Sequence, residues 1–197
     1  MLFDVFPTIK YNDTFIKDIF IDVNSLYQEL LSSVTLTSYT IIGYPRPEVL
    51  SNKLYGTTQY EWCLLVANKV TDPYHGWIKT EDQVYETTTL LYPVTIENPN
   101  GINGTHHLID PDDNDYVYYD LVYFAGDLDS PEGWYHKNDI TYAHLVVQGT
   151  LYPVTNIEYE LNENEKKRSI LIIPPSQISK FLDAMHRLIN ERYNKKY

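Results

Sequence analysis

The sequence has little cysteine and no long hydrophobic run, and each shortage excludes a class of protein. Cys63 is the only cysteine, so the chain can form neither an intrachain disulfide nor a thiolate cluster for zinc. We expect this thiol to be a small buried apolar group rather than a catalytic nucleophile. No apolar run reaches the roughly 18 residues of a membrane span. The first residues lack the basic start and apolar stretch of a signal peptide, which favours a soluble protein made inside the cell.

Basic residues are also scarce. The 15 Lys and Arg against 27 Asp and Glu leave a net charge of −12, with a pI near 4.8. Such a surface repels phosphate backbones and anionic lipid, so we expect no nucleic-acid or membrane partner. The one basic cluster, Lys166 to Arg168, is too short to change this.

Catalytic motifs are missing as well. The sequence has no Gly-x-Ser-x-Gly, no His-Glu-x-x-His and no phosphate-binding glycine loop. A glycosidase needs two carboxylates about 5–10 Å apart, and no motif fixes such a pair. We therefore predict no enzyme, no catalytic residue, no cofactor and no metal ligand.

The sequence is rich in apolar residues and in tyrosine. The 197 residues, 43% of them apolar, suffice for one domain or two small ones. Nineteen of the 28 aromatic residues are Tyr, a residue favoured at protein interfaces. A tyrosine-rich core or a biased genome would give the same composition.

Residues 39–78 have the clearest local pattern. A β-branched and aromatic strand over 39–42 is broken by Gly43-Tyr44-Pro45-Arg46-Pro47. Pro47 suits the first turn of a helix that Gly56 ends after Tyr55. A second helix follows from about Gln59 and ends near Asn68. The prediction is strand–helix–helix in about 35 residues.

The flanking segments are predicted less sharply. Residues 1–38 form an N-terminal arm, with a short strand or extended arm over 18–23 and a helical turn over 26–31. Residues 79–150 form a β-rich insertion with long loops, turns at 98–101 and 103–104, and strands over 116–124 and 144–147.

The C-terminal segment, 151–197, contains strands and an amphipathic helix. Residues 151–161 alternate partly like a strand, 162–167 form a polar turn, and 169–173 form a short buried strand. Ser176 is the expected N-cap of a long helix. An apolar stripe at helical spacing indicates that this helix docks on its own domain, although a partner helix could also cover it: Ile178, Phe181, Leu182, Met185, Leu188 and Ile189.

Several of these stretches resemble the T4-type phage baseplate wedge protein 53 family. The resemblance rests on three stretches, with 79–110 and 121–150 poorly matched: Tyr39-Thr40-Ile41 through Asp72-Pro73-Tyr74-His75-Gly76-Trp77, Asp112 to Asp120, and Asn162 to Phe181. It implies an α+β fold with a small LysM-like βαα(β) core, a β-rich insertion and a C-terminal strand plus amphipathic helix.

The same resemblance implies a function. The chain would be a structural subunit of a contractile-tail baseplate wedge in the virion, made in the host cytoplasm. It would join neighbouring wedges around the central hub, with other wedge and hub-proximal subunits as its partners.

Two sets of residues take candidate roles within that interpretation. Candidate interface residues border the proline turns: Tyr44, Arg46, Tyr74, His75 and Trp77. For Tyr74 and Trp77 the alternative is that both simply cap the small core. Candidate core residues hold the helices on the strands: Tyr39, Leu54, Tyr55, Trp62, Leu65, Ile178, Phe181 and Leu182.

A LysM-like core also raises an alternative function, a peptidoglycan-binding tail accessory protein. LysM modules bind sugar between two loops, here Gly43 to Pro47 and Asn68 to Tyr74. The usual Gly-Asp-Thr after the first strand is replaced by Gly43-Tyr44-Pro45, which argues against peptidoglycan binding.

Two patterns in the sequence could form metal sites, and each also has a simpler explanation. Asp110, Asp112 and Asn114 match the start of an EF-hand loop, but Asp115 stands where Gly belongs and Leu121 where Glu belongs. A solvated acidic turn fits better. His106 and His107 could chelate a transition metal, but adjacent loop histidines more often point apart.

Overall fold

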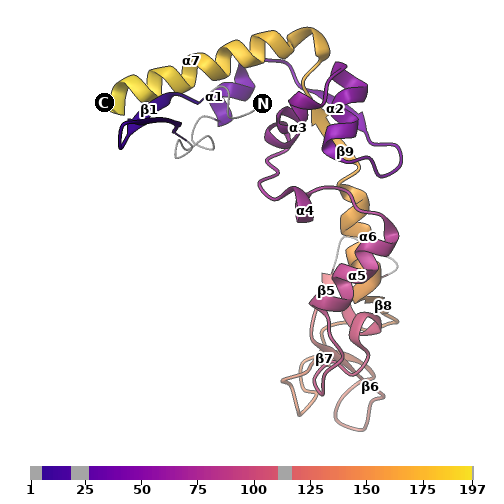
Figure 1. Cartoon of the computed structure of the whole chain (residues 1–197). Coiled ribbons are helices and arrows are strands. Elements are labelled where there is room, and N and C mark those ends of the chain that lie inside the picture. The colour runs from indigo at the N-terminus through magenta and orange to yellow at the C-terminus, as the bar shows by residue number, and fades with distance from the viewer. Residues whose placement is uncertain (1–5, 19–26, 111–116, 197) are drawn as a thin grey trace. The chain divides into compact units, whose positions relative to one another are not determined.

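The chain is α+β, as predicted, and it folds into two compact units (Figure 1). The computed structural model describes residues 6–18, 27–110 and 117–196, without the side chains of 27, 28 and 193–196. Unit 1 combines Met1–Lys79 with Glu165–Tyr197, and unit 2 is Thr80–Asn164. The four predicted segments, as functional divisions of the chain, remain a prediction.

A two-stranded antiparallel sheet organises unit 1. Strand β3 (Thr37–Thr40) pairs with β9 (Ser169–Ile172), with Thr37 opposite Ile172. The predicted strand over 39–42 therefore lies two residues too late. Ile41 N still donates to Arg168 O at 2.9 Å, but the Ile41 side chain turns into the core. The predicted strand over 169–173 is confirmed to within one residue.

Helices α2 (Pro47–Tyr55) and α3 (Glu61–Ala67) follow strand β3, as predicted. Pro47 starts α2, where its missing N–H costs nothing. Gly56 ends α2 in a left-handed conformation with φ 73°, and its N–H donates to Asn52 O. A short 3-10 turn, η3 (Thr58–Tyr60), precedes α3.

Asn68 connects α3 to the sheet. Its side-chain amide donates to the carbonyls of Leu64 and Leu171 and accepts from Leu171 N, each at 2.8 Å. The helices cover a cluster of buried residues: Ile41, Leu50, Leu64, Trp77, Ile78, Ile170 and Ile172. The chain thus runs strand–helix–helix and is completed by a distant strand. That this core is LysM-like remains a prediction.

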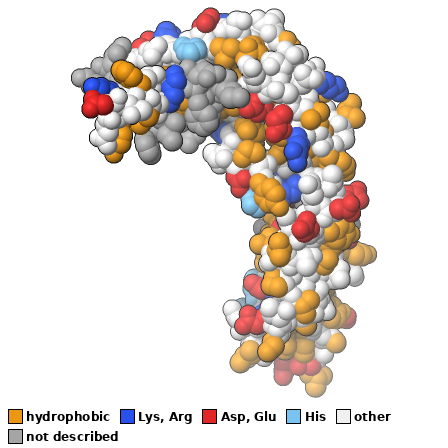
Figure 2. Space-filling model, viewed as in Figure 1, with side chains coloured by type: hydrophobic (Ala, Val, Ile, Leu, Met, Phe, Trp, Pro, Cys, Tyr) orange, Lys and Arg blue, Asp and Glu red, His pale blue; other side chains and the backbone are white. Residues whose placement is uncertain are grey.

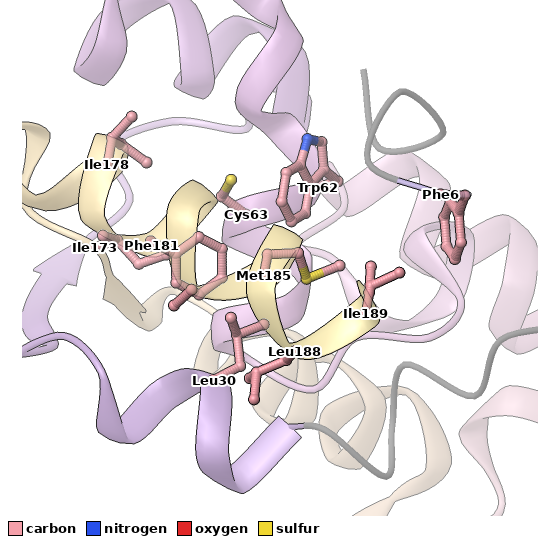
Figure 3. Packing of buried hydrophobic residues seen from close by; sticks show 11 residues of the cluster. Phe6, Leu30, Trp62, Cys63, Ile173, Ile178, Phe181, Met185, Leu188 and Ile189 are labelled. Carbon is pink, nitrogen blue, oxygen red and sulfur yellow. The ribbon is translucent and has the colours of Figure 1, made fainter. Parts of the chain in front are cut away.

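A second cluster in unit 1 lies against the long C-terminal helix α7 (Ile178–Lys196) (Figure 3). Helix α1 (Tyr27–Ser32) contributes Leu30, and α3 contributes Trp62, whose ring centroid lies 5.9 Å from that of Phe181. The predicted stripe of α7 faces this cluster, with all members buried except the half-buried Leu182. The helix therefore docks on its own unit.

The start of α7 differs from the prediction. Residues Pro175–Gln177 form a 3-10 turn, η5, and Ser176 lies inside it rather than at an N-cap. The Pro174-Pro175 pair favours this tight turn because neither residue has an N–H to donate. The side chain of Gln177, the last residue of this turn, accepts a hydrogen bond from Thr35 N at 2.8 Å.

Residues 8–17 form a hairpin that was not predicted. Strands β1 (Thr8–Tyr11) and β2 (Thr14–Lys17) pair antiparallel. Asn12 and Asp13 both have positive φ, as a two-residue hairpin turn requires. Of the strand predicted over 18–23, Asp18 follows β2 and the rest lies outside the described residues. The helical turn predicted over 26–31 corresponds to α1.

Unit 2 begins with a helix that was not predicted. Helix α5 (Glu81–Leu91) starts with a capping box between Thr80 and Gln83. The β-branched run Thr87-Thr88-Thr89 obscured it, because such residues favour strands. Each of these hydroxyls donates to the carbonyl four residues back, which accommodates the run within the helix.

The rest of unit 2 contains short strands and a further helix. Strand β4 (Thr105–Ile109) lies between β5 (Val117–Tyr118) and β8 (Tyr152–Thr155). Strand β6 (Leu121–Phe124) pairs with β7 (Gly133–His136). A small cluster of Leu108, Leu121 and Leu151 supports them. The 98–104 turns and η4 (Gly101–Asn103) join α5 to β4 and close no hairpin.

Three predictions in this region are correct only in part. The strand over 116–124 is split at Asp120, whose φ of 57° ends one strand before the next begins. Residues 144–147 make only an isolated bridge from Val147 to Trp134. The strand predicted over 151–161 is confirmed only over 152–155, as β8. Helix α6 (Asn156–Lys166) takes the place of the rest of that strand and of the predicted turn, because Thr155 and Glu158 form reciprocal capping bonds.

Candidate interaction surfaces

Arg168 holds the loop that carries Tyr44 and Arg46. Its Nη1 donates to the carbonyls of Ile41 and Gly43, both at 3.0 Å. Its Nε and Nη2 donate to the two carboxylate oxygens of Glu165 at 2.8 Å. This hydrogen bonding lowers the pKa of Glu165. Arg168 also lies 5.2 Å from the ring centroid of Tyr44, so one guanidinium fixes both the loop and its aromatic side chain.

A second loop carries Tyr74 and His75 in the short helix α4 (Pro73–Gly76). Asp72 caps this helix by accepting from Tyr74 N at 2.9 Å, and its other oxygen lies 2.5 Å from His75 Nδ1. The His75 bond lowers the pKa of Asp72. Lys79 Nζ lies 4.6 Å from the Tyr74 ring centroid. These contacts hold both rings at the surface, with Tyr74 65% exposed.

Trp77 joins the two loops. Its indole Nε1 donates to Pro45 O at 2.8 Å, and its side chain is only 5% exposed. The structure therefore brings four of the five candidate interface residues to the surface and places Trp77 beneath them. In this chain the indole caps the core. Tyr44, Arg46, Tyr74 and His75 form what we call the two-loop surface.

The candidate core residues lie in the two clusters of unit 1. Trp62, Ile178 and Phe181 are buried. The remaining five are half-buried against the clusters: Tyr39, Leu54, Tyr55, Leu65 and Leu182. Tyr55 donates its hydroxyl to Ile173 O at 3.0 Å, which satisfies the polar end of a ring that packs against both clusters.

In unit 2 the two adjacent histidines point together, contrary to expectation. A β-bulge between Thr105 and His107 brings the rings together, with Nδ1 of His106 2.8 Å from Nδ1 of His107. Tyr159 stacks on His106 with a centroid distance of 3.8 Å. Burial, and then the charge of His106, lower the pKa of His107.

The described residues contain no cluster of three or more potential metal ligands. No group of three or more His, Cys, Asp or Glu side chains is arranged to hold an ion among them. Of the residues that resemble an EF-hand loop, Asp110 follows β4, Leu121 is buried in β6, and Asp112, Asn114 and Asp115 lie outside the described residues. Within the described part of the chain, no helix is both long enough and apolar enough to cross a membrane.

A hollow of about 760 Å³ lined by charged and polar residues also opens in unit 2. Two internal contacts occupy most of its charged groups. Lys137 Nζ lies 2.8 Å from Asp120, and Asp139 accepts from His144 N at 2.8 Å. The bond from His144 is the main reason why the pKa of Asp139 is lowered. The charged groups of Lys137, Asp120 and Asp139 in the hollow are therefore bonded to each other or to the backbone, and we assign no ligand to it.

Comparison with known proteins identifies the family. A family model described as base plate wedge protein 53 matches residues 1–188. The chain belongs to this family. It is also 32% identical, over 202 residues, to the baseplate wedge protein gp53 of Enterobacteria phage T4, and the match covers 98% of each chain. The chain is accordingly a structural protein of a bacteriophage tail baseplate.

Sequence reasoning missed one surface feature, the apolar residues at the end of α5 and after it. Leu90, Leu91, Val94 and Ile96 are all exposed. The signal is present in the sequence as four aliphatic residues between Glu86 and Glu97. The β-rich pattern of this region obscures it, because the apolar residues of strands are expected to be buried on one face.

Proposed function

We propose that this chain joins neighbouring wedges around the central hub during baseplate assembly. Its partners are other wedge subunits and hub-proximal subunits, and the role needs no catalytic group. The observation that carries the proposal is the family match along nearly the whole chain, which extends across both units.

The division into two units supports this role. A joining subunit needs at least two contact surfaces, and each unit here has its own buried cluster to support one. The units also differ in charge. Unit 1 has 14 basic and 11 acidic residues, a net charge of +3, whereas unit 2 has 1 basic and 16 acidic residues, a net charge of −15. Surfaces of such different charge select different partners.

The two-loop surface is the contact that we propose for unit 1. Tyr44 and Tyr74 are exposed aromatic residues, each fixed by a cation, so little conformational entropy is lost when a partner covers them. Arg46 adds an exposed charge beside them. Trp77 supports the surface from below through its bond to Pro45.

A stop codon at Trp62 tests the proposed function in the phage itself. Particles made in a non-suppressing host are imaged by electron microscopy, with the full chain supplied from a plasmid as the control. We expect free wedges without complete baseplates or tails, and rescue by the plasmid. Complete virions that attach or penetrate poorly would contradict the assembly role and favour peptidoglycan binding through the same two loops.

A further inference from the structure

Helix α5 is poorly covered by its own unit. Only Val84 and Thr88 are buried, and Thr88 uses its hydroxyl to bond Val84 O at 2.7 Å. None of the three hydrophobic clusters found among the described residues includes a residue of α5. A helix of three turns depends mainly on packing of an apolar face for its stability. This helix therefore has an apolar end that the described residues of its own unit leave uncovered.

The uncovered residues are concentrated in one short stretch, which we call the 90–96 apolar segment. Leu90 is 77% exposed, Leu91 61%, Val94 75% and Ile96 100%. Figure 2 shows hydrophobic side chains at the surface over the region that Figure 1 labels α5. Single exposed apolar residues are ordinary, but four within seven positions are typical of a protein interaction site.

The charge around this segment restricts what can cover it. Glu86 and Glu97 flank it, and the only basic residue of unit 2, Lys137, is already paired with Asp120. A partner with acidic residues facing this surface would be repelled. A second copy of unit 2 would bring a further net charge of −15 to the contact, so a symmetric dimer through this face is disfavoured.

We propose that the 90–96 apolar segment, with Glu86 and Glu97 beside it, docks a neighbouring baseplate subunit that presents apolar side chains bordered by Lys or Arg. This inference rests on the proposed function and names the chemistry of one partner. The apolar side chains supply the buried contact, and the carboxylates select for basic residues. Binding consequently weakens as salt rises.

The test uses wedges purified from cells infected with the Trp62 stop mutant, to which the full chain is added back. Sedimentation measures binding of the wild-type chain and of the double variant Leu90→Ser, Ile96→Ser. We expect the double variant to bind at least about tenfold more weakly. The matched control is Leu128→Ser, Ile140→Ser, which alters two other highly exposed apolar residues of unit 2 and leaves binding unchanged.

A second pair of variants tests the charge of the partner. Glu97→Lys and Asp129→Lys each change the net charge of unit 2 by the same amount, at exposed positions. We expect only Glu97→Lys to weaken binding, by about threefold or more, and raised salt to reduce the difference. Circular dichroism of each variant confirms that the chain is folded.

The outcomes separate the two proposals. A wild-type chain that binds no wedges overturns the proposed function and this inference with it. Wild-type binding that the Leu90, Ile96 and Glu97 variants leave unchanged overturns the inference alone. Binding that strengthens with salt, or self-association of the chain through this segment, contradicts a basic partner.

Discussion

The indole Nε1 of Trp77 donates a hydrogen bond to Pro45 O at 2.8 Å, although the two residues are 32 positions apart. This bond fixes the α4 turn against the loop that leads into α2, and both loops carry candidate interface residues. The Trp77 ring itself belongs to the buried cluster beneath them. The position of the two-loop surface therefore depends on a core residue that no partner needs to touch.

Replacing Trp77 tests this dependence. Trp77→Phe keeps an aromatic ring but removes the donor, so we expect a loss of about 1–3 kcal/mol of stability and faster hydrogen exchange in peptides from 43–47 and 72–76. Trp134→Phe is the matched control, because it removes a similar indole bond, 2.9 Å to Gly149 O, in unit 2. Equal exchange in the two loops for wild type and Trp77→Phe would contradict the role of this bond.

Arg168 provides a second test of the same surface. Arg168→Lys cannot reproduce the paired bonds to Glu165 together with those to Ile41 and Gly43. We expect a stability loss of about 1 kcal/mol, measured by urea unfolding, and faster exchange in the loop. Arg187→Lys is the control, since its exposed pair with Glu191 at 3.4 Å should change stability by less than about 0.5 kcal/mol. Equal effects of the two substitutions would contradict the prediction.

The sequence predicted best those elements whose ends are determined by local chemistry. Pro47 and Gly56 delimit α2 through the backbone conformations that they favour, and the structure begins and ends the helix accordingly. The stripe of α7 is equally clear, because apolar residues recur at helical spacing over three turns. These signals need no information about distant parts of the chain.

The remaining elements were predicted poorly for one of two reasons. Either two local sequence signals conflict, or the element depends on residues far away in the sequence. In α5 three threonines mask a helix that its capping box makes possible, and in α6 the pair Thr155 and Glu158 starts a helix within an apparently alternating stretch. The pairing of β3 with β9 joins residues about 130 positions apart, which local patterns do not specify. The two-loop surface likewise depends on bonds between residues far apart in the sequence, from Trp77 to Pro45 and from Arg168 to Gly43, so its residues were predicted but their spatial arrangement was not.

The burial of Cys63 predicts low reactivity. Its side chain is fully buried beside α7, and burial raises the pKa of the thiol well above its usual value, so thiolate is scarce near neutral pH. We expect a disulfide reagent to modify the folded chain at least about 100-fold more slowly than the chain in denaturing urea. Absorbance of the released thiolate follows the reaction. Similar rates in both conditions would show that the cluster around α7 opens readily.

His107 predicts how stability responds to mild acid. Because burial and His106 lower its pKa in the folded chain, the unfolded chain binds protons first as the pH falls below the usual value of 6.5. This contribution to stability is therefore complete above about pH 7 and is lost as the pH falls through 6.5 toward the lowered pKa. We expect melting temperatures between about pH 5.5 and 7.5 to fall with acid in the wild type and to fall less in His107→Gln. His136→Gln, at an exposed histidine of the same unit, is the control and should retain the wild-type slope. An identical pH dependence in His107→Gln and the wild type would show that the closely spaced histidine rings do not resist protonation.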